Sequence, residues 1–425
     1  MTILDKHINK LKSAFFYAVE AGTPEKIFSD EIKSLLPKDK ELKILSLGKA
    51  ASSMAEKMAD MNISQSGIVV TNDENFRHIE NFTCFATGHP FPDKRGLNAS
   101  KKVELFLEEL SDKDHLILLL SGGGSSLLPA PPEGITLKEK IYINKVLLES
   151  GLDITEVNAV RRVFSRLKGG RLAQKAYPAG ITQFVFSDVL DDSLETIASG
   201  VAAPDPYEFS EVQKILTKTK LNNIKFVSDF IAKVGKNKNL LPLKKDNKVF
   251  EKIKTYLLAN NETCVNAAKI FFENENYFVN SFYQKLQGEA SLIGSELADS
   301  IIKTINKDKS LSIFGGETTV TVKNSYGKGG RSQELALSFA ISMNKNYNQK
   351  KPWAILSAGT DGRDGPTDAA GAIITSNSKI NISDAIKSLH KNDSYNFLYK
   401  NKLLFKTGGT NTNLGDLVFI LNWKF

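Results

Sequence analysis

The sequence has little cysteine and no long hydrophobic run, and each shortage excludes a class of protein. The two cysteines, Cys84 and Cys264, form no CxxC pair, so neither a disulfide framework nor a zinc site is predicted. The apolar run at 116–120 is far shorter than the roughly 20 residues that a membrane-spanning helix needs, and the mean hydropathy is -0.22. No membrane-spanning segment is therefore predicted.

At the N-terminus, apolar residues recur at helical spacing instead of forming the continuous core of a signal peptide. They are Leu4, Ile8, Leu11, Phe15 and Val19, and lysines interrupt them. This pattern predicts a helix and no secretion signal. With no membrane-spanning segment either, the expected location is the cytoplasm.

The motifs of several enzyme classes are also missing. No GxxxxGK[ST] segment is present, which excludes an ordinary P-loop enzyme, and no GxGxxG follows a predicted strand, which argues against a nicotinamide-dependent enzyme. HExxH and GxSxG are absent as well. The five histidines form no pair with metal-ligand spacing, and only His89 has a position that indicates function.

Length and composition are those of an ordinary folded protein. At roughly 100 to 200 residues per domain, 425 residues predict two or three domains. Hydrophobic residues make up 41% and charged residues 24%, and 25 Phe with 11 Tyr supply enough apolar area for real cores. A small disulfide-stapled module and a globally disordered chain are both excluded.

The net charge of +8 does not indicate a nucleic-acid-binding protein, because the lysines are spread along the chain without groove-reading motifs. Such a charge would help to gather small anionic substrates. Arginine is scarce, and four of the eight arginines are Arg161, Arg162, Arg166 and Arg171. A guanidinium group can hold a carboxylate or phosphate at two points, so anion binding is favoured for this segment over a solvated basic helix. Some of these arginines are expected to brace the two domains.

Alternating strands and helices in the first half predict a doubly wound parallel sheet. The predicted strands are 43–47, 67–71, 83–86, 116–120 and 181–186, and the predicted helices are 51–61, 97–110 and 137–150. Nearly continuous apolar strands fit a parallel sheet that is buried on both faces. Each strand runs into a polar loop, so these loops are expected to gather at the carboxyl edge of the sheet.

A second α/β unit is predicted after a connecting region at about 205–250, which is rich in Lys and Asn. Its predicted strands are 255–259, 277–281, 311–314, 318–322, 354–357, 370–375 and 417–421. Gly315-Gly316 is interpreted as a tight turn between two antiparallel strands.

The loop SGGGSS follows the buried strand at 116–120 and carries the strongest chemical signal. It consists of Ser121, Gly122, Gly123, Gly124, Ser125 and Ser126. A flexible turn needs one glycine, whereas three consecutive glycines allow a ligand to approach the backbone and their N–H groups to form an anion-binding nest. A carboxylate or phosphate is the expected ligand.

Two further loops of the first half carry candidate residues. Lys49 follows the first strand, where a lysine can reach phosphate oxygens, although this signal is weak by itself. Asp188 follows the strand at 181–186, and its carboxylate is interpreted as a Mg²⁺ ligand, a proton acceptor or a helix N-cap.

Two glycine-rich loops stand out in the second half. The loop at 327–334 places Lys328 and Arg331 at the entrance of a predicted helix, which is typical of a phosphate site. The loop at 359–368 combines three aspartates with three glycines, a composition that suits a metal site and a turn equally well.

Together these segments resemble the class II glycerate kinases, the glycerate 2-kinase family with a C-terminal MOFRL domain. The matching segments are LGKAA at 47–51, GHPFPD at 88–93, SGGGSSLL at 121–128, NAVRR at 158–162, KGGRLA at 168–173, SDV at 187–189, IASG at 197–200, LQGEA at 286–290, GGETTVTV at 315–322, GKGGRSQELAL at 327–337 and GTDGRDGPTDAAGA at 359–372. They keep the order of the family over nearly the whole chain.

The resemblance implies an α/β protein with a Rossmann-like doubly wound domain at 1–235 and a smaller C-terminal α/β domain with a mixed sheet at 236–425. The implied reaction uses Mg²⁺ and transfers the γ-phosphate of ATP to the 2-hydroxyl of D-glycerate, in a cleft between the domains. The product would be 2-phosphoglycerate. The expected partners are these small molecules, with no nucleic acid and no membrane, and a homo-oligomer is compatible with the sequence.

The resemblance also implies roles for particular residues. Lys49, Asp188 and Arg331 align with residues that the family is thought to use in catalysis, and Asp188 and Asp361 are the metal candidates. The implied substrate- and phosphate-binding residues are the SGGGSS loop, His89, Asn158, Arg161, Lys168, Arg171, Glu317, Gly329 and Gly330. The rival functions are a hydroxypyruvate reductase and a non-catalytic module that binds sugar acids.

Overall fold

The computed structural model describes residues 2–189, 191–304, 309–322, 327–347 and 351–423. The chain divides into two compact units. The central unit is Phe28–Leu258, and the terminal unit combines Met1–Ile27 with Ala259–Phe425. None of the helices in the described residues is long and apolar enough to cross a membrane.

The central unit contains a six-stranded sheet in the order β3-β2-β1-β4-β5-β6. Its strands are β1 (Glu41–Leu47), β2 (Gly67–Asn72), β3 (Phe82–Thr87), β4 (Asp114–Leu120), β5 (Gly180–Phe186) and β6 (Ile253–Ala259). The registers of β1 with β2 and β4, of β2 with β3 and of β4 with β5 are all parallel. This is the strand order of a doubly wound, Rossmann-like sheet, and it confirms the predicted fold class.

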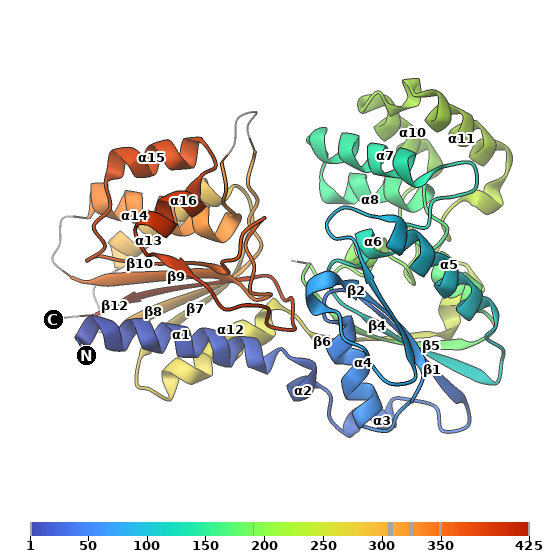
Figure 1. The fold of residues 1–425 in the computed structure, drawn as a ribbon, viewed down its shortest axis with the longest axis horizontal. Coiled ribbons are helices and arrows are strands. Elements are labelled where there is room, and N and C mark those ends of the chain that lie inside the picture. The colour runs from blue at the N-terminus through green and yellow to red at the C-terminus, as the bar shows by residue number, and fades with distance from the viewer. Residues whose placement is uncertain (1, 190, 305–308, 323–326, 348–350, 424–425) are drawn as a thin grey trace. The chain divides into compact units, whose positions relative to one another are not determined.

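Apolar side chains on the strands explain why this sheet is covered by helices. Leu118 and Leu120 of β4 are buried in the same cluster as Val103 and Leu107 of α5 (Lys94–Glu108). Figure 1 shows the sheet between helices, with α4 and α5 labelled. The other short and helical elements of this sheet region are α3 (Glu31–Ser34), η1 (Asp73–Asn75), α4 (Ala51–Asp60), α6 (Gly124–Leu127), α9 (Arg171–Ala176), η2 (Ile197–Ser199) and η5 (Lys248–Lys252).

A separate helical layer covers one end of the central unit (Figure 1). It contains α7 (Leu137–Glu149), α8 (Ile154–Val163), α10 (Phe209–Lys218), α11 (Lys225–Lys236) and the short η3 (Leu221–Asn223) and η4 (Lys238–Leu240). These helices share one apolar cluster, in which Ile143, Val160, Leu216 and Phe230 are buried. The prediction of a connecting region at 205–250 was therefore wrong: this stretch contains the amphipathic helices α10 and α11, whose apolar faces pack in this cluster.

The terminal unit contains the second sheet, in the order β11-β10-β9-β12-β8-β7. The strands are β7 (Phe278–Leu286), β8 (Ser310–Gly316), β9 (Trp353–Gly359), β10 (Gly371–Thr375), β11 (Leu404–Phe405) and β12 (Asp416–Asn422). Only β7 and β8 pair in parallel, and the other recorded pairs are antiparallel. The sheet is therefore mixed, as predicted.

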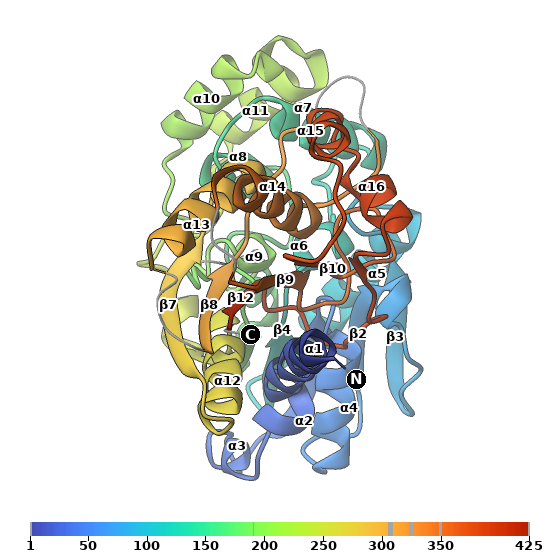
Figure 2. The ribbon, with the colours of Figure 1, turned by 90° about the vertical axis from the view of Figure 1, so that its left-hand side faces the viewer.

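Helices cover both faces of this mixed sheet (Figure 2). One face carries α13 (Ala290–Thr304), α14 (Arg331–Asn346), α15 (Ile382–His390) and α16 (Ser394–Lys400), and the other carries α1 (Ile3–Ala21) and α12 (Asn261–Glu273). The short α2 (Pro24–Ile27) ends the N-terminal segment. Phe15 of α1 meets Phe405 edge-on, with ring centroids 5.2 Å apart.

The structure differs from the sequence-based division of the chain at 235/236, which falls at the end of α11. Two long-range associations account for the difference. The N-terminal helix packs with α12 of the terminal unit, and β6 joins the central sheet beside β5, where Gln183 Nε2 donates to Thr255 Oγ1 at 2.9 Å. Strand 255–259 was expected in the second unit.

The prediction of a tight turn at Gly315-Gly316 was wrong. Both glycines lie in β8, where Gly316 pairs with Asp416 of β12, and residues 318–322 form no strand. A Cβ at Gly315 would fall 1.7 Å from Oδ1 of Asn261, whose Nδ2 donates to the Leu414 and Asp416 carbonyls. Position 315 requires glycine because the Asn261 side chain packs directly against the backbone of β8 there.

One buried ion pair joins the helical layer to the rest of the central unit. Arg162 Nε lies 2.7 Å from Asp205 Oδ1, and both side chains are 2% exposed. Arg162 Nη1 also donates to the Glu195 carbonyl at 3.1 Å. Burial raises the pKa of Asp205, against the attraction of Arg162.

Replacing Arg162 by Met should therefore leave Asp205 as an uncompensated buried carboxyl group. We expect a loss of about 3–5 kcal/mol in the free energy of unfolding, measured with urea, and a smaller loss in the double variant with Asp205→Leu. Lys145→Met, which removes an exposed pair with Glu149, should cost less than about 1 kcal/mol. A double variant as unstable as Arg162→Met alone would show that the unpaired carboxyl is not the cause.

Candidate active site

The loops after β1 and β4 meet at the point where the strand order of the central sheet reverses. From β1 the chain proceeds outward to β2 and β3, whereas from β4 it proceeds the other way to β5 and β6. The register pairs Leu47 with Leu120, so both strands end at the same level. Open α/β sheets bind ligands at this reversal, outside the carboxyl ends of the strands.

Backbone hydrogen bonds hold these two loops together. Lys49 N donates to the Gly122 carbonyl at 2.8 Å, and Ser121 N donates to the Leu47 carbonyl at 2.9 Å. Ala50 N donates to Ser121 Oγ at 3.0 Å. The backbone of Lys49 is thus hydrogen-bonded directly to the glycine-rich loop. From the sequence, only a gathering of these loops at one edge of the sheet was predicted.

Gly123 lies next to two other predicted site residues, His89 and Lys49. Its φ is +86°, and a Cβ there would lie 3.1 Å from Nε2 of His89 and 3.2 Å from Cγ of Lys49. The loops after β1, β3 and β4 therefore converge at Gly123. Any side chain at this position would press on both the imidazole and the lysine.

The serines of the loop continue into a buried chain of hydrogen bonds. Ser125 Oγ lies 2.8 Å from Ser199 Oγ, which donates to Asn158 Oδ1 at 2.9 Å. Ala198, Ser199 and Gly200 have φ values of +50°, +57° and +69°. Consecutive left-handed residues are costly for non-glycine residues and are concentrated at functional sites. Ser199 was not among the predicted site residues, although IASG was among the matching segments.

Lys168 also stabilises this loop through side-chain hydrogen bonds. Its side chain is buried, and Nζ donates to the carbonyls of Ser125 at 2.9 Å and Leu128 at 3.2 Å. Burial, with a smaller contribution from Arg161, lowers the pKa of Lys168 to about 7. The structure thus uses this amine, predicted to bind substrate or phosphate, to hold loop carbonyls.

Other basic residues of the segment 158–172 also contact carbonyls or amides. Arg171 Nη1 donates to the carbonyls of Arg162 at 2.7 Å and Ser165 at 2.5 Å, and Nη2 donates to the Leu240 carbonyl. Arg161 Nε donates to Asn144 Oδ1 at 3.4 Å. In this structure the guanidinium of Arg171 braces the backbone of the central unit.

Asp188 follows β5, the strand next to β4, and is half-buried. The register pairs Val185 with Leu120, so Asp188 lies at the same edge of the sheet as the glycine-rich loop. The turn is fixed by Ser187, whose Oγ accepts from Val189 N at 3.2 Å. A carboxylate oxygen at this edge is the donor type that Mg²⁺ prefers.

In the terminal unit, Arg331 is held by two carboxylates. Its Nε and Nη2 donate to Asp416 at 2.6 and 3.0 Å, and its Nη1 donates to Glu317 at 2.5 Å. Burial works against the charged form, but Asp416 and Glu317 outweigh it and raise the pKa of Arg331. Arg331 and Glu317, which were predicted separately as a catalytic and a substrate-binding residue, are therefore in direct contact, and Asp416 was not among the predicted site residues.

The two glycine-rich loops of the terminal unit pack against polar neighbours at the start of α14. A Cβ at Gly330 would lie 2.3 Å from Oδ1 of Asp364, which accepts from Ser332 N and Gln333 N at the helix start. A Cβ at Gly329 would lie 2.3 Å from Ser394 Oγ. Burial, reinforced by Asp416, raises the pKa of Asp364 to about 7.

The metal candidates were Asp188 of the central unit and Asp361 of the terminal unit. Asp361 Oδ1 accepts from Arg363 N at 3.0 Å, which is the geometry of a turn. Among the residues that the structure describes, no three His, Cys, Asp or Glu side chains form a metal-binding group. Mg²⁺ is commonly bound by one or two carboxylates together with substrate phosphates, so Asp188 alone still fits such a role.

Comparison with known proteins identifies two sequence families in the chain. A model described as a domain of unknown function, DUF4147, matches residues 10–231, and the MOFRL family model matches residues 310–416. The D-glycerate 2-kinase of Thermotoga maritima is 36% identical over 93% of this chain and 94% of its own length. The glycerate 2-kinase of Picrophilus torridus is 31% identical over 91% of this chain and 88% of its own length.

Solved structures show the same similarity. The crystal structure of a glycerate kinase from Thermotoga maritima has a TM-score of 0.83 and 34% sequence identity, and the match covers 98% of this chain and 99% of that one. A protein from Pyrococcus horikoshii has a TM-score of 0.76 and 28% identity, with coverage of 100% and 99%.

The lowered pKa of Lys168 makes stability depend on pH in a defined direction. Between about pH 7 and pH 10.5 the unfolded chain binds a proton that the folded chain has lost, so this group increases stability as pH rises. Compared with Lys168→Met, the wild type should therefore gain up to about 1.4 kcal/mol per pH unit above pH 7.

Urea unfolding at several pH values measures this difference, with Lys145→Met as the control because the Lys145 side chain is 67% exposed. The free energy of unfolding of the Lys145→Met control should change with pH as that of the wild type does. If Lys168→Met also runs parallel to the wild type, the Lys168 amine titrates as in the unfolded chain and the prediction is wrong.

Proposed function

Because the chain belongs to the glycerate 2-kinase family, with a DUF4147 and a MOFRL domain, we propose that it transfers the γ-phosphate of ATP to the 2-hydroxyl of D-glycerate. The products are 2-phosphoglycerate and ADP. One structural observation carries this proposal: Lys49, His89 and the glycine-rich loop converge at the reversal point of the central sheet. We place the reaction in the cytoplasm, where ATP is available.

In this proposal the central unit binds the anionic groups of the reactants. The N–H groups of the SGGGSS loop and the ammonium of Lys49 neutralise carboxylate or phosphate oxygens. His89 supplies a ring nitrogen next to Gly123 that can hydrogen-bond the acceptor. Phosphoryl transfer depends mainly on such positioning and on the stabilisation of charge.

Asp188 acts on the acceptor hydroxyl in this scheme. Its carboxylate either orients the 2-hydroxyl and accepts its proton, or provides an oxygen ligand for Mg²⁺. A bound Mg²⁺ would neutralise charge on the phosphate oxygens. Ser199, through Ser125, fixes the shape of the loop against which the acceptor lies, and so it serves as a positioning residue.

Arg331 is proposed to stabilise the charge on the transferred phosphoryl group. A guanidinium has five N–H donors, so the bonds to Asp416 and Glu317 do not exhaust its capacity to bind phosphate. The two carboxylates keep the side chain charged and fix its orientation. The role of Arg331 in phosphoryl transfer is taken from the family resemblance.

Product analysis tests the reaction directly. With ATP, Mg²⁺ and D-glycerate, the full chain should release ADP only when D-glycerate is present. The phosphorus NMR signal of the product should be a doublet, since the phosphate of 2-phosphoglycerate is attached to a carbon that bears one hydrogen. A triplet would identify the 3-phosphate. Oxidation of NADH by hydroxypyruvate without ADP release would favour a reductase, and binding without turnover a sugar-acid-binding module.

Gly123 and Gly134 form a matched pair for testing the site. Both have φ of +86°, but a Cβ at Gly134 meets nothing within 4 Å, whereas one at Gly123 presses on His89 and Lys49. Gly123→Ala and Gly134→Ala should therefore share the backbone strain, while only the first displaces the reacting groups. We expect kcat/KM to fall on the order of 100-fold for Gly123→Ala and to change little for Gly134→Ala.

Circular dichroism and thermal unfolding of both variants control for the shared strain. Equal losses of activity in the two variants would place the reaction away from Gly123. Such a result would contradict the proposed site without contradicting the proposed reaction.

A further inference from the structure

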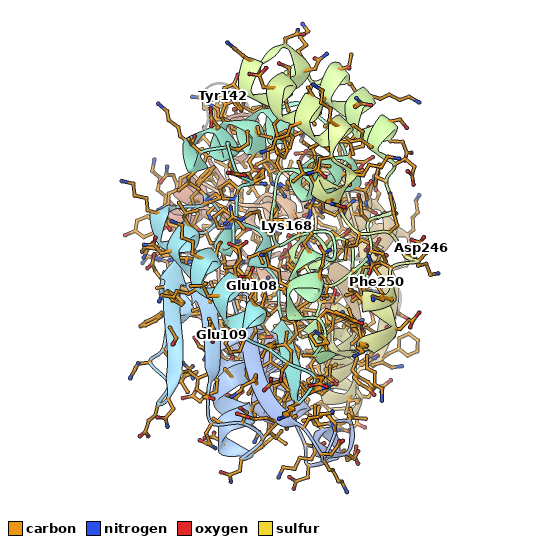
Figure 3. All side chains as sticks on the ribbon, turned by 90° about the vertical axis from the view of Figure 1, so that its right-hand side faces the viewer. Glu108, Glu109, Tyr142, Lys168, Asp246 and Phe250 are labelled. Carbon is orange, nitrogen blue, oxygen red and sulfur yellow. The ribbon has the colours of Figure 1, made fainter. Side chains whose placement is uncertain are left out.

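The central unit contains a cavity of about 330 Å³ that the proposed reaction does not use. It lies between the end of α8, α9, α11 and η4. Among the described residues, none of the SGGGSS loop or of the loops after β1, β3 and β5 lines it. Its volume is at the lower end of the range for small-molecule sites, about 300–1,000 Å³. Figure 3 shows the side chains of the central unit, with Lys168 and Glu108 labelled.

The charged part of the lining is basic. It consists of Arg166, Arg171 and Lys175, and no acidic residue lines the cavity among those that the structure describes. Arg166 donates to Glu104 at 2.9 and 2.6 Å, and Lys175 lies 2.6 Å from Glu108. Lys175 also lies 3.5 Å from Glu104, and neither carboxylate lines the cavity.

The positive charge of this region exceeds the negative charge that faces it. Arg171 is 8% exposed and donates to neutral carbonyl oxygens instead of a carboxylate. The two carboxylates, Glu104 and Glu108, therefore balance only two of the three lining cations. Low-dielectric walls focus such an excess of charge into a cavity.

The uncharged lining combines polar Ser165, Gln174 and Asn239 with apolar side chains, which are Pro132, Val163, Phe230 and Leu240. A fully inorganic ion would leave these side chains without a partner. We propose that the cavity is a second binding site, for a small organic acid with one carboxylate or phosphate head and an apolar body. The head lies against Arg166 and Lys175, and the body lies against Phe230 and its neighbours.

The cavity wall is continuous with the segment that follows the glycine-rich loop. Arg166 N donates to the Ala130 carbonyl at 2.8 Å, and its Nη1 donates to the Pro131 carbonyl. Lys168, two residues further on, donates to the carbonyls of Leu128 and Ser125. A ligand that draws on the Arg166 guanidinium therefore acts on the chain that anchors the SGGGSS loop, so this site is suited to an effector.

Fluorine NMR of the full chain tests the proposal without any need for activity. The probes are 4-fluorobenzoate and 4-fluorophenyl phosphate, which carry the two anionic heads on the same apolar body. We expect at least one probe to bind the wild type with a dissociation constant below about 10 mM and to stay bound in the presence of ATP and D-glycerate. No binding of either probe in that range would overturn the proposal, as would displacement by the two substrates.

Matched variants locate the bound probe. Gln174 lines the cavity and Gln213 of α10 does not, and both are exposed glutamines on helices of the central unit. Gln174→Trp should abolish binding, whereas Gln213→Trp should leave it unchanged. Equal binding by the two variants would overturn the assignment.

A charge-matched pair tests the anionic head. Lys175→Gln should weaken binding about tenfold, because a hydrogen bond to a charged group is lost, while Lys145→Gln removes the same charge elsewhere and should have no effect. Equal losses of probe binding in the two variants would show that only the net charge of the protein matters, and would overturn the proposed site. Titration of the favoured probe into the kinase assay then reports whether its occupancy changes turnover.

Discussion

Backbone carbonyl oxygens, rather than carboxylates, hold two buried cations, Lys140 and Arg171, at the C-terminal end of α8. Lys140 Nζ donates to the carbonyls of Arg161 and Phe164, and Arg171 donates to those of Arg162 and Ser165. The last carbonyls of a helix have no partner within the helix and carry the negative end of its dipole. The side chains of Lys140 and Arg171 therefore supply hydrogen-bond donors for the carbonyls at and just after this helix end.

The position of the glycine-rich loop depends on this arrangement. The stretch of chain from 165 to 171 places Lys168 under Ser125 and Leu128, and it places Arg166 against the Ala130 carbonyl. The loop after β4 is thus supported from a helix end in another layer of the unit. Neutral residues in these places would leave several buried carbonyls without donors, which costs more than an ordinary hydrogen bond contributes.

Much of the fold could be predicted because local patterns decide it. The apolar strands of the central sheet and the polar loops that follow them are continuous stretches of sequence, and the structure has them within a few residues of the predicted bounds. The placement of β6 and α1 could not be predicted, because it depends on partners far along the chain. The same applies to Gly315, where the crossing side chain of Asn261 is more than fifty residues away in sequence.

The site shows the same division. Lys49, Gly123 and His89 were predicted from loops after strands, and the geometry of a parallel sheet brings such loops together. The segment 158–172 was interpreted from its residue types and their spacing, and these do not reveal whether an arginine contacts a ligand or a carbonyl group. Ser199 was missed because its importance comes from a left-handed backbone and from contacts with Ser125 and Asn158.

The N-terminal helix has a consequence for synthesis on the ribosome. Its buried residues, among them Leu11 and Phe15, pack with α12 and Phe405, which emerge only after the whole central unit. At roughly 5–20 residues per second, the interval before α12 appears is about 12–50 s. During that time the central unit can fold on its own, while α1 exposes an apolar face. Nascent chains should therefore be a target for chaperones that bind amphipathic helices until the terminal unit closes over this face.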